Sequence, residues 1–150
     1  MDRYQSEHEI ENMVRAFETC ETGKDDFKHR DHLAVAVWYL QTLGREAALE
    51  RMRSALLRFL DHHEVDRKQY NETITVFWIE IVAEKLNEIG AGVSLVEKCN
   101  RVVDGMSKDL VAEYYSAERL WSDEARQRFL TPDLKVQSSS FSLWNRYPTT

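Results

Sequence analysis

The sequence predicts an all-α fold, an up-and-down bundle of four or five long helices followed by two short C-terminal helices. Three observations lead to this prediction. Apolar residues recur at three- and four-residue spacing through most of the chain. All five glycines fall between the periodic segments, where helices commonly end. Both prolines, Pro132 and Pro148, lie near the C-terminus, so no proline interrupts a segment before residue 132.

The first three predicted helices each have an apolar face. They span about residues 7–21, 30–42 and 45–62. The second is apolar on nearly every side, and we expect it to be the most buried element. The apolar positions that define the three helices include Ile10, Met13, Val14 and Phe17, then Leu33, Val35, Val37 and Leu40, then Leu49, Met52, Leu56 and Phe59.

The fourth segment, residues 70–89, has a mixed signature. Its centre, residues 74–82, is rich in β-branched and aromatic side chains, which are typical of strands. The length of the segment, its lack of Gly and Pro before residue 90, and the helix-forming residues 83–88 favour a buried helix. We therefore predict a helix.

Glu80 stands alone inside this apolar run, and a buried carboxylate is costly unless it is paired. We expect it to pair with Tyr39 or Arg53. The alternative is a carboxyl group with a raised pKa at the floor of a pocket.

The C-terminal third contains shorter segments. A fifth helix is expected at about 93–104, a short helix from Ser107 to near Tyr115, and another that begins at Ser122, where a serine cap is followed by acidic residues. Residues 131–150 are predicted to be irregular.

We divide the chain into a helical bundle domain, residues 1–134, and a C-terminal tail, residues 135–150. The tail carries aromatic residues, which indicate that it packs on the body of the protein or on a partner.

The composition and the lack of targeting patterns argue against nucleic-acid binding, secretion and membrane insertion. The formal net charge of −6 argues against nucleic-acid binding, because phosphates require a surplus of Lys and Arg. The acidic N-terminus does not resemble a signal peptide, and no apolar run approaches the roughly 20 residues of a membrane span. We therefore expect a cytoplasmic protein with no membrane or nucleic-acid partner. Cys20 and Cys99 form no CxxC motif and are expected to be free thiols.

The stretch Phe27-Lys-His-Arg-Asp-His-Leu33 carries the richest chemistry. His29 and His32 share one helix face, and an up-and-down topology gathers them with His62, His63 and the start of the fourth segment at one end of the bundle. We predict an end pocket there that binds a small polar or anionic molecule. His29 and His32 are the candidate catalytic residues, as general acid or base, and Arg30 is the candidate anion partner. The candidate ligand-binding residues are Arg30, Tyr70, Asn71, Thr73, Tyr114 and Tyr115.

Two other functions stay open, as does the question of whether the protein is an enzyme. In the first, His29 and His32 bind a divalent metal with Glu72 or a loop histidine, although the main prediction includes no metal. In the second, the domain is a non-catalytic interaction module whose tail docks on a second copy or another partner. The residues imply no particular cofactor. We expect His32 to be partly structural and His29 to be the freer, functional group.

Three motifs form a longer pattern: Phe27-x-His-Arg-Asp-His-Leu33 with Trp38-Tyr-Leu40, then Tyr70-x-Glu-Thr-Ile-Thr75, then Tyr114-Tyr-Ser116 with later positions up to Leu134. With this pattern, over about residues 17–134, the chain resembles a family of small helical bacterial proteins of uncharacterised function. The resemblance implies one intact domain in which the three motifs belong to one constellation. The chain departs from the family pattern at Asn71, where a histidine is expected, and this weakens the metal alternative.

Overall fold

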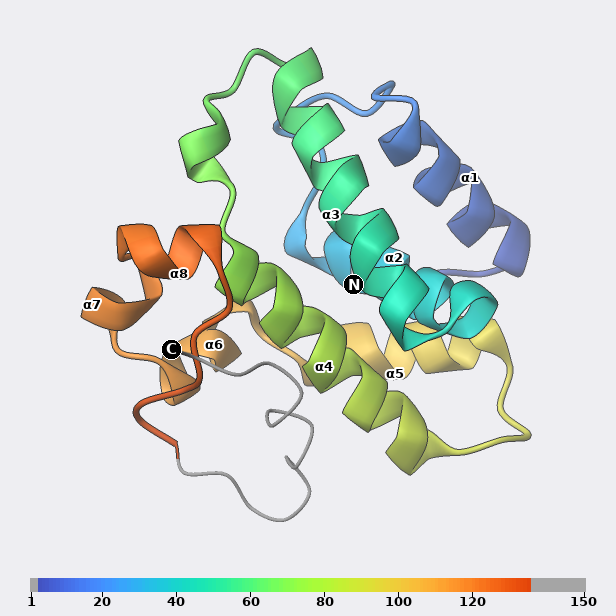
Figure 1. Ribbon diagram of the computed structural model, residues 1–150. Coiled ribbons are helices and arrows are strands. Elements are labelled where there is room, and N and C mark those ends of the chain that lie inside the picture. The colour runs from blue at the N-terminus through green and yellow to red at the C-terminus, as the bar shows by residue number, and fades with distance from the viewer. Residues whose placement is uncertain (1–2, 136–150) are drawn as a thin grey trace.

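The computed structural model describes residues 3–135, and in that range the regular structure is helical, with no strand (Figure 1). The all-α prediction is therefore confirmed for these residues. The tail, with its predicted role in docking, lies outside the described residues from 136 onward. The long helices are α1 (Glu7–Glu18), α2 (His29–Leu43), α3 (Arg45–His62), α4 (Glu72–Ile89) and α5 (Leu95–Gly105).

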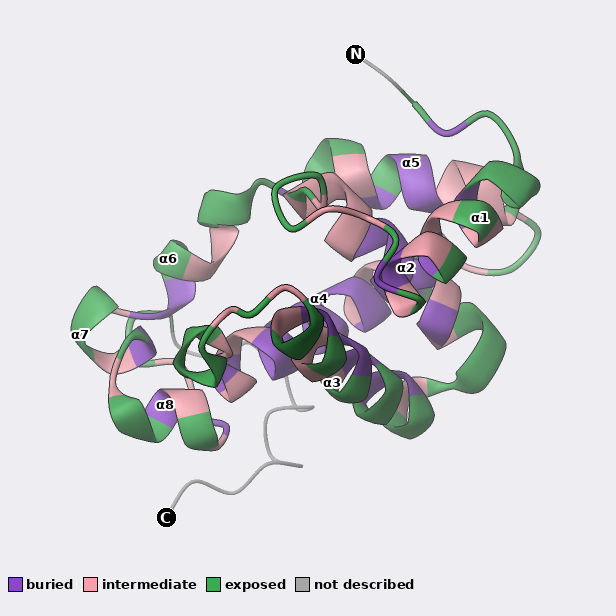
Figure 2. Ribbon diagram, turned by 90° about the horizontal axis from the view of Figure 1, so that it is seen from above, coloured by how far each residue is buried: buried purple, intermediate pink, exposed green. Residues whose placement is uncertain are grey.

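Helix α2 lies in the middle of the molecule, where it contacts α1, α3, α4 and α5 (Figures 1 and 2). Its run from Leu33 to Val37 is completely buried. The expectation that α2 is the most buried element is nevertheless wrong, because α4 buries a larger share of its residues. The reason is that α4 is covered by α2, α3 and α5 and, at its N-terminal end, by helix α8 (Asp123–Gln127) as well.

The strand-like residues 74–82 are helical, as predicted. Helix α4 begins where the side-chain Oδ1 of Asn71 accepts a hydrogen bond from the amide of Ile74, at 3.0 Å. It ends at Ile89, and the next residue, Gly90, has a φ of 80°, which glycine adopts without steric strain. No helix in residues 3–135 combines the length and the apolar character that a membrane span requires.

Glu80 does not pair with either predicted partner. Tyr39 donates a hydrogen bond to Glu18 at 2.6 Å, and Arg53 binds Glu72. Glu80, which is 2% exposed, instead lies 3.7 Å from the guanidinium of Arg45. Arg45 is the first residue of α3, and the packing of α3 on α4 brings the two groups together.

Residues 107–135, which we name the C-terminal lobe, contain three short α-helices where two are predicted. They are α6 (Val111–Tyr114), α7 (Ala117–Leu120) and α8, and a 3-10 turn, η2 (Lys108–Leu110), precedes them. The additional helix arises because Ser116 caps α7 through its hydroxyl, just as Ser122 caps α8. Figure 1 shows the lobe gathered at the N-terminal end of α4, close to the turn η1 (Arg67–Gln69).

Candidate functional site

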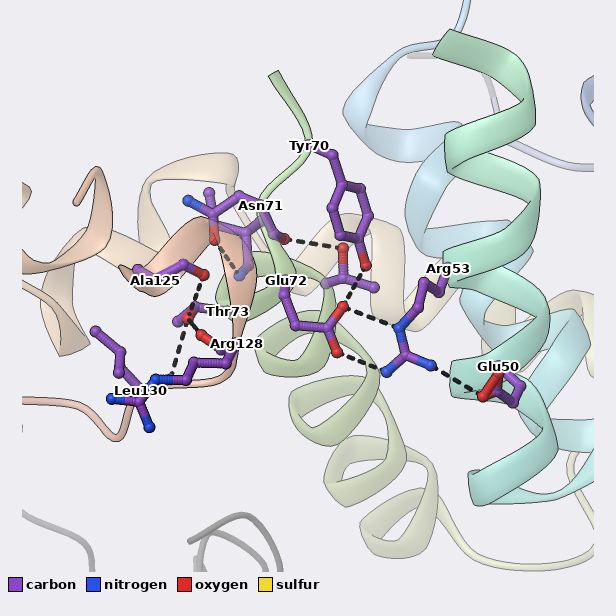
Figure 3. Close-up of polar contacts among 11 residues, drawn as sticks. Glu50, Arg53, Tyr70, Asn71, Glu72, Thr73, Ala125, Arg128 and Leu130 are labelled. Carbon is purple, nitrogen blue, oxygen red and sulfur yellow. Dashed lines mark hydrogen bonds and ion pairs between the residues drawn. The ribbon is translucent and has the colours of Figure 1, made fainter. Parts of the chain in front are cut away.

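The N-terminal end of α4 is linked to α3 by a network of charged groups (Figure 3). Arg53 donates to both carboxylate oxygens of Glu72, from Nε at 3.0 Å and from Nη2 at 2.5 Å. Tyr70 donates its hydroxyl to the same carboxylate at 2.6 Å, and burial together with this contact raises the pKa of Tyr70. The carboxylate of Glu72 is thus engaged by a bidentate ion pair and a tyrosine, which is a stable structural arrangement.

Asn71 and Thr73 face the opposite way, into the C-terminal lobe (Figure 3). The side-chain amide of Asn71 donates to the carbonyl of Leu120 at 2.8 Å. The hydroxyl of Thr73 lies 2.8 and 2.9 Å from the carbonyl oxygens of Ala125 and Arg128. Both side chains are buried, so their polar groups satisfy backbone groups that would otherwise lack partners.

The second tyrosine of the pair Tyr114-Tyr115 completes this junction. The hydroxyl of Tyr115 donates to the carbonyl of Leu130 at 2.6 Å, while the amide of the same Leu130 donates to the hydroxyl of Thr73 at 3.1 Å. Two of the three segments that the sequence joins in one constellation, 70–75 and 114–116, therefore meet at one backbone residue. Tyr114 is buried with its ring edge against Phe77. The hydrogen bonds of this junction indicate a structural role.

The two candidate catalytic histidines lie elsewhere. The Nε2 of His29 lies 3.1 Å from the carbonyl oxygen of Met106. The rings of His29 and Trp78 pack edge to face, with their centroids 4.8 Å apart. Nε2 of His32 is buried, with no hydrogen-bond partner among the described residues. Burial, and secondly the proximity of His29, lowers the pKa of His32 to about 4. Burial also lowers the pKa of His29. The Nε2 of His29 is thus held by a backbone carbonyl, which differs from the expectation that His29 is the freer of the two histidines.

Arg30 packs against the N-terminal segment, with its guanidinium 4.6 Å above the ring of Tyr4. Tyr4 in turn donates to Asp31 at 2.9 Å. Within the described residues no hydrogen bond or ion pair links residues 29–32 to residues 70–75. The structure thus does not bring these two groups of predicted site residues into direct polar contact.

The loop histidines do not complete a metal site. His63 has its Nε2 2.9 Å from the carbonyl oxygen of Thr22, and His62 is an exposed neighbour whose ring lies 4.9 Å from that of His63. In residues 3–135 no group of three or more His, Cys, Asp or Glu is arranged to hold a metal ion. Glu72, the predicted third ligand, is engaged by Arg53 and Tyr70.

One hollow that involves a predicted site residue, Tyr70, lies between η1 and the C-terminal lobe. This polar hollow has a volume of about 650 Å³, in the range of small-molecule sites. Its charged and aromatic lining residues are Asp66, Arg67, Lys68, Tyr70, Trp121, Asp123 and Arg126. Of these, the sequence singles out Tyr70 alone.

A second hollow, of about 320 Å³, lies between α4 and the C-terminal lobe. It is mostly apolar, and we name it the apolar hollow. Trp121 lines both hollows, and it is 52% exposed. The sequence offers no signal for this residue, because periodicity does not tell an exposed tryptophan from a core one. The apolar side chains of this lining are Ile74, Trp78, Val111, Ala112, Ala117, Leu120 and Trp121. The lining also includes Tyr115, a predicted ligand-binding residue, and the charged residues Lys108 and Asp109.

The charges of the polar hollow are partly engaged. Arg126 donates from Nη1 to the carbonyl of Lys68 at 2.6 Å and lies 5.7 Å from the ring of Trp121. Asp66 accepts a hydrogen bond from the amide of Lys68 at 2.9 Å. No contact within the described residues engages the ammonium group of Lys68 or the carboxylate of Asp123. The hollow therefore offers uncompensated charge of both signs.

No family model, curated protein or solved structure matches this chain.

Proposed function

We propose that the protein binds a small charged molecule in the polar hollow. The proposal keeps the predicted class of ligand, a small polar or anionic molecule, and the predicted involvement of Tyr70. It also keeps the predicted up-and-down bundle as its frame. The proposed site lies between η1 and α8, whereas the sequence predicts it at the histidines. The observation that carries it is the coincidence of a hollow of suitable size with an exposed tryptophan and unengaged charges.

Histidine acid–base chemistry has less support. Neither His29 nor His32 lines the polar or the apolar hollow. The Nε2 of His29 is held by a backbone carbonyl. The Nε2 of His32 is buried without a hydrogen-bond partner among the described residues, and this burial disfavours the protonated imidazole. A general acid or base must reach the proton that it transfers, so these positions favour binding over catalysis.

Isothermal titration calorimetry at low ionic strength tests the proposal. The panel consists of amino acids, simple carboxylates, inorganic phosphate and simple amines, titrated into the full chain. We expect at least one of these to bind, and Lys68→Gln or Asp123→Asn to weaken binding about tenfold, since each removes a charge that only the ligand can pair with. Both residues are exposed, so neither substitution should affect folding.

The matched control is Lys24→Gln, which removes an exposed lysine of the loop between α1 and α2. It should leave the affinity unchanged. The proposal is wrong if no compound of the panel binds, or if binding is equally insensitive to substitution at residues 24, 68 and 123.

A further inference from the structure

We infer that the ligand is a zwitterion with an apolar body, of the chemical class of a free apolar or aromatic amino acid. Its ammonium and carboxylate groups lie in the polar hollow, and its side chain lies in the apolar hollow. This inference rests on the proposed function and adds the chemical identity of the ligand.

The first argument is that the two hollows share a wall. Trp121 lines both of them, and about half of its surface is open to solvent. Its position is fixed by Arg126, which donates from Nε to the carbonyl of Trp121 at 3.3 Å and lies against its ring. A molecule seated against this indole therefore reaches the charged groups of the polar hollow on one side and a mostly apolar wall on the other.

The second argument is the balance of charge in the polar hollow. Lys68 and Arg126 supply two positive charges, and Asp66 and Asp123 supply two negative ones. The fifth charged residue, Arg67, is neutralised outside the hollow by a bidentate pair with Asp61 at 2.8 and 3.0 Å. A simple anion meets two carboxylates here, and a simple cation meets two cations. A zwitterion is complementary to both signs, and that complementarity provides specificity.

The third argument is the size and lining of the apolar hollow. Ile74, Trp78 and Leu120 present apolar surface, and the volume of about 320 Å³ is roughly twice that of an apolar cavity known to admit benzene. A phenyl group or a branched aliphatic side chain fits in such a space. Burying it there removes apolar surface from water on both the ligand and the protein.

Calorimetry with phenylalanine and three truncated relatives tests the inference. Glycine lacks the apolar body, N-acetylphenylalanine lacks the ammonium group, and phenylalaninamide lacks the carboxylate. We expect phenylalanine to bind at least tenfold more tightly than any of the three. Trp121→Ala should weaken phenylalanine binding at least tenfold and leave the weak binding of glycine nearly unchanged. Circular dichroism of this variant should match the wild type, because half of the ring is exposed.

Lys68→Gln and Asp123→Asn distinguish the two ends of the ligand. Lys68→Gln should weaken phenylalanine and N-acetylphenylalanine but not phenylalaninamide, and Asp123→Asn should weaken phenylalanine and phenylalaninamide but not N-acetylphenylalanine. Lys24→Gln should change none of these affinities.

Each failure has its own signature. If glycine binds as tightly as phenylalanine, the apolar body is wrong and the proposed function stands. If N-acetylphenylalanine or phenylalaninamide binds as tightly as phenylalanine, the zwitterion is wrong, and the site takes a simple anion or cation. If no apolar or aromatic amino acid binds but a simple carboxylate, inorganic phosphate or a simple amine of the first panel does, the inference is wrong and the proposed function stands. If nothing binds, both fall.

Discussion

His32 illustrates how the surroundings of one residue set its protonation state. Its Nε2 is buried without a hydrogen-bond partner among the described residues, and the pKa of the ring falls to about 4. In an unfolded chain the pKa of histidine is about 6.5. Between these two values the unfolded state binds a proton that the folded state does not, so protonation favours unfolding.

From this shift we predict a specific pH dependence of stability. The part of the unfolding free energy that depends on neutral His32 is fully present above about pH 6.5. It is lost progressively as the pH falls towards 4, to a total of about 3 kcal/mol. Urea unfolding at pH 7, 6 and 5 measures it. His32→Gln should show a smaller loss of unfolding free energy than the wild type over that range. His8→Gln, which removes an exposed histidine of α1, is the control and should follow the wild type. Equal losses in all three proteins would contradict this account of His32.

The residue scale also shows where sequence reasoning about the site ends. The sequence predicts Asn71 and Thr73 as ligand-binding residues, and in the structure they lie at the start of the buried helix α4. Sequence does not reveal that backbone carbonyls of the C-terminal lobe face them. Trp121 and Lys68 are missed because exposure at a hollow depends on how distant segments pack. The ion pair between Glu80 and Arg45 likewise depends on how α3 packs on α4, which the sequence does not reveal.

At the scale of elements, the N-terminal end of α4 is a junction. Thr73 contacts the backbone of the lobe, whereas Thr75, equally buried, donates to the carbonyl of Asn71 on its own helix at 3.1 Å. The two threonines therefore form a matched pair. Thr73 joins two parts of the molecule, whereas the hydrogen bonds of Thr75, to Asn71 and Tyr70, stay within residues 70–75.

We predict that Thr73→Val lowers the free energy of unfolding by about 2–3 kcal/mol, because it leaves buried backbone groups of Ala125 and Leu130, and a partly buried carbonyl of Arg128, without this partner. Thr75→Val should lower it by about 1 kcal/mol. Amide hydrogen exchange gives the second readout: exchange in residues 123–130 should accelerate in the Thr73 variant only. Equal acceleration in both variants, or in neither, would show that Thr73 does not hold the lobe.

Among the elements, the long helices and the helical character of residues 74–82 are the features that the sequence predicts best. Apolar periodicity locates the long helices, and for residues 74–82 the length of the segment outweighs its strand-like composition. The number of helices in the lobe was less predictable, since a single serine cap such as Ser116 separates one short helix from the next. Short elements have few periodic positions, so local capping decides them.

At the scale of the whole molecule, the lobe decides which groups meet. Connectivity alone predicts that His29, His32 and segment 70–75 share one end of the bundle. In the structure the lobe covers segment 70–75, and the Nε2 of His29 contacts the carbonyl of Met106, just after α5. The same covering creates the polar and apolar hollows along the edge of the lobe, with Trp121 between them.

The central claim is that ligand binding occurs at Trp121, along this edge, and not at the histidines. Proton–nitrogen correlation spectra of the full chain, titrated with phenylalanine, test it most directly through the tryptophan indole signals. The account predicts that the signals of Trp121 and Trp78 shift with one saturable dependence on concentration, while that of Trp38 in α2 does not. Unchanged signals of Trp121 and Trp78, with saturable shifts in the amides of residues 29–32, would contradict it.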